Sequence, residues 1–360
     1  MNSNILYYLV VGIFLVQTSC INKEFDEPYS LFEYESDING EPINIEGLQY
    51  NTPVDMIIID SLLIIHDQYN INDTSYFFSV ANLRNMELLN YFGKEGRGPD
   101  EFLFPSMLSR VPGKPNVLGV NNRRLFSFNE ISIENILSNS TKITHSSTNE
   151  LNTGYSKVIK INDKLFFGTG FFQNGRFGIS DSEGDFLYSQ SDYPFNERFK
   201  EMSMMSLGMA FQSNIATHPD KNILAVATLS SANIDFISFS NDSLELKKSI
   251  HLNPPQIENN STESRLSVHD LPENKRGYEF LTSTSNFVYA LYSGVLRSEG
   301  LDKYLTGRVV LQFDWEGNAV KQFNLDQPAK LISVDREDEF LYAMSPDSSG
   351  ENSLLRYHLN

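Results

Sequence analysis

The chain has 360 residues, and its 46 acidic and 28 basic side chains leave a formal net charge of −18. Aromatic residues make up 12% of the chain, which excludes wholesale intrinsic disorder. The acidic excess also argues against a nucleic acid as partner, because binding to phosphates depends on clustered Lys and Arg.

The first residues predict export and a lipid anchor. An apolar run at positions 5–16 is too short to cross a membrane and is typical of a secretory signal. The only cysteine follows directly, in Gln17-Thr18-Ser19-Cys20. This segment resembles the lipobox of bacterial lipoproteins, in which the signal is cut before a cysteine that carries lipid. The alternatives are a signal cut elsewhere and an uncleaved anchor.

We therefore expect residues 1–19 to be a lipoprotein signal peptide, residues 20–30 a tether and residues 31–360 the folded domain. The polar and acidic segment 21–28 resembles the export signal that directs some Bacteroidetes lipoproteins to the outer leaflet of the outer membrane. An ordinary solvated linker is the other interpretation. The expected location is the outer membrane, facing the periplasm or the cell surface.

Beyond residue 50, apolar runs of strand length alternate with turns. Residues 56–59 and 62–65 predict two strands joined by a tight turn at Asp60-Ser61. Strand pairs with the same layout are expected at residues 157–169, 214–228, 287–293 and 331–344. More polar pairs, at residues 177–188 and 309–323, each contain an Asp-x-Glu-Gly turn whose glycine suits a positive φ.

These pairs form a repeated unit of four strands. The second strand of each unit falls near residues 64, 118, 166, 225, 290 and 342. Six units at spacings of roughly 50 to 65 residues predict an all-β, six-bladed β-propeller with four-stranded antiparallel blades around a central channel. A sandwich or jelly roll is the second choice. We expect the last strand, 353–359, to close the ring by pairing with residues near 30–50.

Two stretches interrupt the pattern. Residues 195–211 hold four methionines between positions 202 and 209 and predict a short helix or a folded loop. The methionines are either plain packing or an adaptable binding surface. Residues 253–277 are polar and predict a long exposed loop before the fifth unit.

A glycine motif after the first unit carries a family resemblance. It consists of Gly93-Lys94-Glu95-Gly96-Arg97-Gly98-Pro99-Asp100-Glu101-Phe102. This motif resembles a signature of the Bacteroidetes TolB-like six-bladed β-propeller lipoproteins, and segments 287–294 and 313–318 are similar to that group as well. The resemblance covers about residues 30–360. It implies a six-bladed propeller and carries over no catalytic residues.

Four residues are candidates for ligand binding: Arg97, His66, Arg123 and Tyr292. Arg97 has a structural interpretation, in which it binds carboxylate or backbone acceptors in a compact turn between blades. In the functional interpretation it faces the channel and holds a carboxylate or a sugar hydroxyl. His66 ends a predicted strand and either faces the channel or is a hydrogen-bonded structural histidine.

Catalytic constellations are otherwise hard to find. The six histidines show no metal-ligand spacing, so we predict no metal and no cofactor. Adjacent Asp100 and Glu101 would point to opposite sides of a strand and would not flank one glycosidic bond. The predicted function is a noncatalytic propeller module of the cell envelope that binds or scaffolds a protein, peptide or glycan. The alternative is an extracellular carbohydrate-active hydrolase or lyase, which paired carboxylates in the channel would favour.

Overall fold

The structure is a computed structural model that describes residues 27–71, 74–98, 100–138, 145, 147–240, 243–262, 265–347 and 349–359. Cys20, the predicted signal peptide and most of the predicted tether lie outside these residues.

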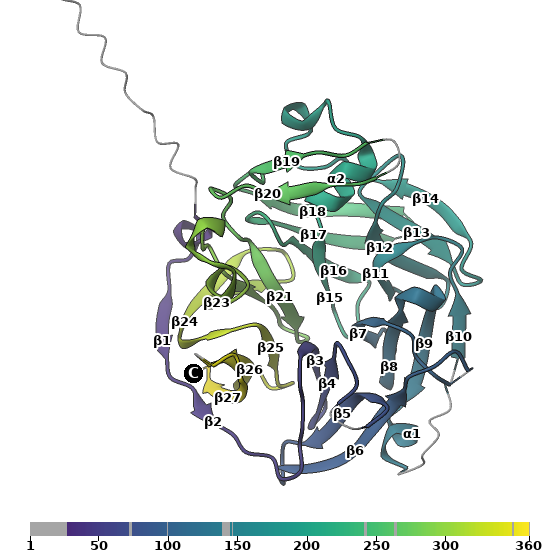
Figure 1. Ribbon diagram of the computed structural model, residues 1–360, viewed down its shortest axis with the longest axis vertical. Helices are drawn as coiled ribbons and strands as arrows, with labels where there is room; N and C mark the ends of the chain where they lie inside the picture. The colour runs from purple at the N-terminus through teal and green to yellow at the C-terminus, as the bar shows by residue number, and fades with distance from the viewer. Residues whose placement is uncertain are drawn as a thin grey trace, which may run out of the picture.

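Six sheets, the blades, stand in a ring around a central channel, which Figure 1 views end on. Successive strands of a blade are antiparallel neighbours, and the first strand lies next to the channel. Blade 1 contains β3 (Pro53–Ile59), β4 (Leu62–Asp67), β5 (Tyr76–Asn82) and β6 (Glu87–Lys94). Blade 2 contains β7 (Pro105–Val111), β8 (Lys114–Asn122), β9 (Ser127–Ser132) and β10 (Ser147–Glu150). Blade 3 contains β11 (Tyr155–Lys160), β12 (Leu165–Gly170), β13 (Phe177–Asp181) and β14 (Phe186–Gln190).

The second half of the ring repeats this layout. Blade 4 contains β15 (Ser213–Thr217), β16 (Ile223–Thr228), β17 (Asn233–Ser240) and β18 (Ser243–His251). Blade 5 contains β21 (Tyr278–Ser283), β22 (Phe287–Tyr292), β23 (Gly307–Asp314) and β24 (Ala319–Ala329). Blade 6 contains β25 (Leu331–Val334), β26 (Phe340–Pro346) and β27 (Asn352–His358). The predicted six-bladed propeller is therefore confirmed, and all six predicted second strands fall within β4, β8, β12, β16, β22 and β26.

The N-terminal segment closes the ring from outside. β1 (Glu35–Ile38) runs parallel to β24 as a fifth strand of blade 5. The short β2 (Glu41–Pro42) then pairs antiparallel with β27 and completes blade 6. The expected pairing of the last strand with residues near 30–50 is thus confirmed, and the two ends of the domain share one sheet.

Turn chemistry explains the blade hairpins. Asp60 adopts a left-handed φ of 53° between β3 and β4, and Gly317 has a φ of 78° between β23 and β24. In that second turn, the carboxylate of Asp314 accepts the backbone N–H of Glu316 at 3.0 Å and of Asn318 at 2.8 Å. An acidic side chain that binds backbone N–H groups two and four residues on holds the predicted Asp-x-Glu-Gly turn in shape.

The hydrophobic core lies between blades. Every residue of β4 is buried, because its two sides face the two neighbouring blades. On one side, Ile64 packs with Phe78 and with Leu118 and Val120 of blade 2. Ring closure therefore matters for stability, since each blade covers its neighbour.

Short helices and one extra hairpin interrupt the blades. Between blades 3 and 4 lie η3 (Asn196–Phe199) and α2 (Met204–Ala210), which confirms the helical alternative for this stretch. Between blades 4 and 5, the predicted loop contains a hairpin of β19 (Ile257–Asn259) and β20 (Val268–Asp270), which lies beside α2. The remaining helices are η1 (Pro28–Leu31), η2 (Arg123–Leu125), α1 (Ile133–Leu137), η4 (Arg297–Glu299) and α3 (Leu301–Tyr304). Across the described ranges, none of the helices is long and apolar enough to span a bilayer.

The blades define two faces of the disc. We call the face at which the first strand of each blade begins the top face. It carries the loops at residues 68–75, 95–104, 123–126, 151–154, 171–176, 191–212, 252–277 and 293–306. We call the opposite face, where the first strand turns into the second, the bottom face. Its turns lie at residues 60–61, 112–113, 161–164, 218–222, 284–286 and 335–339.

Candidate functional site

The central channel is narrow. It encloses a cavity of about 50 Å³ lined by residues of β3, β7, β11, β15 and β21. That volume holds one or a few water molecules, whereas sites for small organic ligands occupy about 300–1,000 Å³. The channel interior therefore does not have the size of a substrate site.

Hydrogen bonds join the inner strands of neighbouring blades near the top end of the channel. The carboxylate of Asp55 on β3 accepts the backbone N–H of Leu108 on β7 at 2.7 Å. Lys157 on β11 donates through Nζ to Oδ1 of Asn214 on β15. Asn214 in turn donates to the backbone carbonyls of Tyr278 and Glu279 on β21, at 3.1 and 2.8 Å. The polar groups of the channel thus hold the inner strands together.

Burial shifts the pKa values of these groups towards their neutral forms. Burial raises the pKa of Asp55 to about 6, although Lys157 and two backbone N–H groups oppose the shift. Burial also lowers the pKa of Lys157, against the attraction of Asp55 and Glu279. The pKa of Glu279 is raised by burial, while its ion-pair partner Arg276 opposes the change. One ammonium therefore lies within the electrostatic range of two carboxylates, in a balanced buried network.

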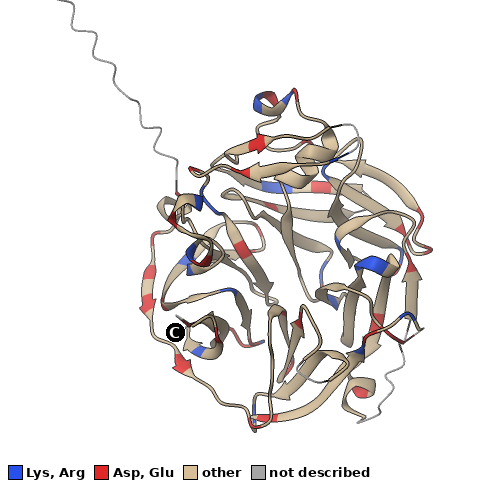
Figure 2. Cartoon of the chain, in the orientation of Figure 1, with Lys and Arg blue, Asp and Glu red and all other residues tan. Residues whose placement is uncertain are grey.

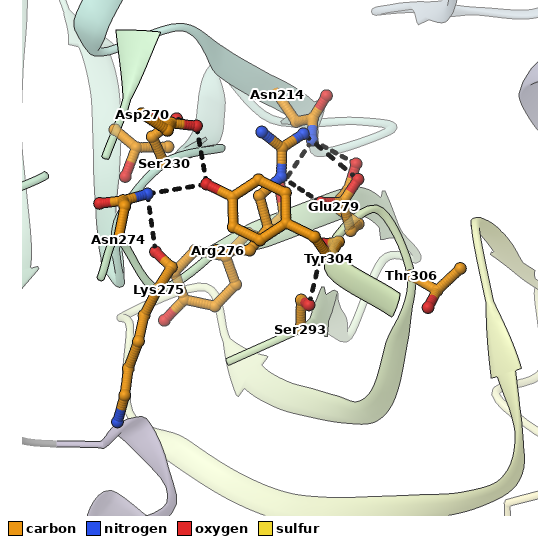
Figure 3. Close-up of polar contacts among 12 residues, drawn as sticks. Asn214, Ser230, Asp270, Asn274, Lys275, Arg276, Glu279, Ser293, Tyr304 and Thr306 are labelled. Carbon is orange, nitrogen blue, oxygen red and sulfur yellow. Dashed lines mark hydrogen bonds and ion pairs between the residues drawn. The ribbon is translucent and has the colours of Figure 1, made fainter. Parts of the chain in front are cut away.

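A second polar cluster fixes loops of the top face between blades 4 and 5 (Figure 3). The hydroxyl of Tyr304 donates to Asp270 at 2.7 Å and accepts from Asn274 at 2.8 Å. Burial and the bond to Asp270 raise the pKa of Tyr304, so this hydroxyl remains a donor at neutral pH. The guanidinium of Arg276 lies 5.3 Å from the centre of the Tyr304 ring. This cluster ties α3 to the loop that follows β20.

The bottom mouth of the channel opens into a larger hollow of about 320 Å³. Its polar and charged lining residues are Asp60, Arg110, Lys114, Asn116, Asp220, Thr284, Ser285 and Arg336. We call this hollow the bottom pocket. Its volume is in the range of small-molecule and peptide side-chain sites.

Two arginines dominate the electrostatics of the bottom pocket. Arg110 donates from Nη2 to the backbone carbonyl of Ile58 at 2.6 Å, which fixes its guanidinium at the mouth. Burial lowers the pKa of Arg110 to about 10; Asp220 opposes this shift, and the nearby positive charge of Arg336 adds to it. Arg336 is exposed and forms no ion pair within the described residues. The lining contains three cations, Arg110, Lys114 and Arg336, and two carboxylates, Asp60 and Asp220, which leaves a local excess of positive charge in an acidic protein.

The top face carries a different hollow above blades 2 and 3. It measures about 420 Å³ and is lined by Phe104, Arg123, Arg124, Phe126, Gly154, Tyr155 and Phe171. We call this set the aromatic–arginine patch. Phe104 is 47% exposed and Phe126 is 54% exposed, and the side chains of Arg123 and Arg124 have no ion pair or hydrogen bond with any described residue.

The structure separates the four predicted ligand-binding residues. Arg123 lies in the aromatic–arginine patch, and Arg97 lies in the top-face loop between β6 and β7. The channel-facing interpretation of His66 is wrong, because His66 is only 1% exposed and its ring packs inside blade 1, 5.0 Å from the Phe78 ring. Neither ring nitrogen of His66 bonds a described residue, and burial lowers its pKa to about 3.

Tyr292 is also not available for a ligand. Its side chain is fully buried at the top end of β22, and its hydroxyl donates to the Glu27 carboxylate at 2.7 Å. The same carboxylate pairs with Lys275. Tyr292 therefore holds the N-terminal segment against blade 5.

The expected partners of Arg97 are not found among the described residues. Arg97 is exposed, and no hydrogen bond or ion pair joins it to the described chain. Glu101 stabilises the turn instead, since its carboxylate accepts the N–H of Gly98 at 2.8 Å. A Cβ at position 96 would lie 1.8 Å from Oε2 of Glu101, so a side chain there would displace the carboxylate that holds the turn. The turn needed an acceptor for its N–H groups, whereas the prediction assumed that it needed a donor.

Sequence reasoning missed most residues of the channel and its mouths. A signal was present: Asp55 and Lys157 are charged residues inside the first strand of their units, next to apolar neighbours. In a propeller the first strand faces the channel, so such residues are candidates for its lining. No group of three potential metal-ligating side chains occurs in the part of the chain that the structure describes.

The ring of six blades around a narrow central channel places the protein among the six-bladed β-propellers. The family model of TolB-like six-bladed propellers matches residues 34–337, and the chain belongs to this family. The family resemblance of the glycine motif is thus confirmed.

Two solved structures show the same fold. One is a protein of Bacteroides fragilis NCTC 9343, named as a candidate exported protein, with 12% sequence identity and a TM-score of 0.54 over 90% of this chain and 98% of that one. The other is a member of the DUF4221 family from Bacteroides vulgatus ATCC 8482, with 11% identity and a TM-score of 0.53 over 90% of this chain and 96% of that one. No curated protein matches the sequence.

Proposed function

We propose that the protein is a noncatalytic binding module of the cell envelope that is held to the outer membrane by lipid on Cys20 and binds a carboxylate-bearing ligand in the bottom pocket. The ligand chemistry is an acidic sugar or an acidic peptide segment, since both present carboxylates to guanidinium groups.

One observation carries the binding site. Arg110 and Arg336 lie close enough for the charge of one to lower the pKa of the other, in a pocket of about 320 Å³. A bound carboxylate between two guanidinium groups would remove their repulsion and accept charge-assisted hydrogen bonds. The pocket is also lined by residues of five blades, so a ligand bound there contacts several of them.

Support for the envelope location comes from the sequence and from the relatives. The apolar run before Cys20 has the length of a secretory signal, and the Bacteroides fragilis structure with the same fold belongs to a protein named as a candidate exported protein. A Cys20→Ala variant is expected to lose incorporation of radiolabelled fatty acid and to leave the membrane fraction. Unchanged labelling and retention would contradict the lipid tether.

The alternative of a hydrolase or lyase rests on Asp55 and Glu279, two carboxylates near Lys157 in the channel. Both carboxylates already bind groups of the protein, and the cavity between the inner strands measures about 50 Å³. These features favour a structural role for the channel network over a catalytic one.

Calorimetric titration tests the binding site. The probes are an oligogalacturonate and a glutamate-rich peptide, with a neutral cello-oligosaccharide as control. We expect one of the two acidic probes to bind and the neutral sugar not to bind. Arg336→Ala is expected to weaken binding at least tenfold, while its melting temperature stays unchanged because the side chain is exposed. Equal binding by the wild type and Arg336→Ala would contradict the proposed site.

A further inference from the structure

Exposed apolar side chains are distributed unevenly over the two faces of the disc. Large hydrophobic residues that are at least 40% exposed on the top face are Tyr69, Phe104, Phe126, Met205, Leu301 and Leu305. Near the bottom face, Leu137 of α1 is 38% exposed, and Phe186 and Leu187 are 39% and 49% exposed at the bottom end of β14, the outer strand of blade 3. Isolated exposed side chains need no explanation, but a collection on one face marks an interaction surface.

The two exposed phenylalanines of the aromatic–arginine patch both have an unfavourable backbone conformation. Phe104 has a φ of 62° and Phe126 a φ of 49°, in the left-handed region that non-glycine residues rarely adopt. The carbonyl of Phe126 accepts the N–H of Leu151 at 2.6 Å, which fixes this conformation. Glycine would adopt the same backbone with less strain, so the benzyl groups at these two exposed positions are compatible with a role for the rings themselves.

The chain leaves the described domain on the same face. Glu27, the first described residue, is bound by Lys275 and Tyr292 at the top of blade 5. Seven residues separate Glu27 from Cys20, and a chain of that length spans at most about 25 Å. A lipid on Cys20 therefore keeps the top face close to the bilayer.

The tether and the aromatic–arginine patch lie on opposite sides of the ring. Glu27 is fixed at blade 5, whereas the patch lies over blades 2 and 3, and Figure 1 shows these blades across the channel from one another. A tether at one edge alone would leave the disc free to tilt. A second contact at the far edge would fix the top face against the membrane.

The charges of the patch fit a bilayer surface. Acidic residues are spread over the disc (Figure 2) and include the exposed Glu197, Glu201 and Asp302 of other top-face loops, yet Arg123 and Arg124 have no ionic partner among the described residues. Arginines beside exposed aromatic rings match the boundary between lipid phosphates and acyl chains. The patch has few polar groups apart from these guanidinium groups, which disfavours a sugar as its occupant.

We infer that the top face is a membrane-docking surface, with Phe104 and Phe126 inserted at the lipid interface and Arg123 and Arg124 bound to lipid phosphates. This inference rests on the lipid tether of the proposed function. It orients the bottom pocket away from the membrane, towards ligands in the surrounding space.

The test uses the full lipidated chain in vesicles of phosphatidylglycerol and phosphatidylcholine. Lipid on Cys20 occupies the only natural thiol, so Thr153→Cys and Asn116→Cys each provide one labelling site for an environment-sensitive dye. Position 153 lies in the top-face loop next to the patch, and position 116 lines the bottom pocket. We expect a nitroxide-labelled lipid to quench the dye at position 153 at least threefold more strongly than the dye at position 116.

Two further variants show whether the patch causes this difference. Phe126→Gly and Phe104→Gly, each in the Thr153→Cys background, are expected to reduce quenching towards the level at position 116 without loss of folding, because glycine suits both backbone positions. Equal quenching at both positions in vesicle-retained protein would overturn the docking surface and leave the tether intact. Quenching that does not respond to either variant would also overturn the inference.

The remaining outcomes are equally decisive. Loss of the protein from the vesicles would contradict the lipid tether, and the docking inference would fall with it. If no lipid quenching occurs but poly-glutamate changes the fluorescence at position 153, the patch serves an acidic protein partner and the membrane inference is wrong.

Discussion

The two faces of the propeller are built from opposite ends of the same strands, and they differ in chemistry. At the top, buried polar bonds join the inner strands, the N-terminal segment is fixed, and apolar side chains are exposed around the ring. At the bottom, the channel opens into a pocket with arginines that the protein does not neutralise completely. Charges that are paired inside the ring stabilise it, whereas charges left without a close partner at its surface are available to a ligand. Four substitutions test this distinction.

The largest effect is expected from Lys157→Met, which removes the ammonium group from the buried network near the top end of the channel. Asp55 and Glu279 would lose the buried charge that stabilises both, so the free energy of unfolding should fall by about 3–5 kcal/mol. Urea denaturation measures this change. Lys164→Met is the control, because this lysine is exposed in the turn between β11 and β12, and a change within about 0.5 kcal/mol is expected there. Similar losses in both variants would refute the role of the network.

The second effect concerns pH. The folded-state pKa of Asp55 is about 6, above the ordinary value of 3.8, so the folded protein keeps this proton at pH values where the unfolded chain has released it. Its contribution to stability is therefore complete below about pH 4 and is lost as the pH rises through 6. The two-unit shift corresponds to roughly 3 kcal/mol. Asp55→Asn should remove this part of the pH dependence, and denaturation of both proteins at pH 4 and pH 7 measures it. An unchanged pH profile in the variant would show that Asp55 does not titrate in this range.

A smaller effect is expected at the attachment of the N-terminal segment. Tyr292→Phe removes the hydrogen bond to Glu27 and should lower stability by about 1 kcal/mol. Tyr278→Phe is the matched control, because the Tyr278 hydroxyl is buried next to Tyr292 and has no partner among the described residues. Thermal unfolding should therefore show a loss in the first variant and no loss in the second. A loss of stability in Tyr278→Phe without a loss in Tyr292→Phe would contradict the role of the Tyr292–Glu27 hydrogen bond.

The smallest effect on folding is expected at the exposed patch. Phe126→Gly should change the free energy of unfolding by less than about 1 kcal/mol, because relief of the left-handed backbone offsets the greater freedom of glycine in the unfolded chain. Calorimetric unfolding measures the change. A loss above 2 kcal/mol would mean that the ring is part of the core and not of a free surface.

Local patterns were sufficient to predict the ring. The run from Met56 to Ile65 with its Asp60-Ser61 turn specifies a buried hairpin, and its repetition at six places indicates the number of blades. Contacts between distant segments were not predictable in the same way. Lys157 bonds Asn214, and Tyr292 bonds Glu27 from 265 positions away, so their roles depend on ring closure. The partners predicted for Arg97 are absent among the described residues for a local reason. Its turn presents the backbone N–H of Gly98, which the carboxylate of Glu101 accepts.

The most direct test of the difference between the faces is a calorimetric titration of Arg336→Ala and Arg123→Ala with the acidic probe that binds the wild type. Both arginines are exposed and lack an ionic partner among the described residues, but Arg336 lies in the bottom pocket and Arg123 on the top face. The account predicts that Arg336→Ala raises Kd at least tenfold and that Arg123→Ala leaves Kd unchanged. A greater loss with Arg123→Ala would place the ligand site on the top face and contradict the account.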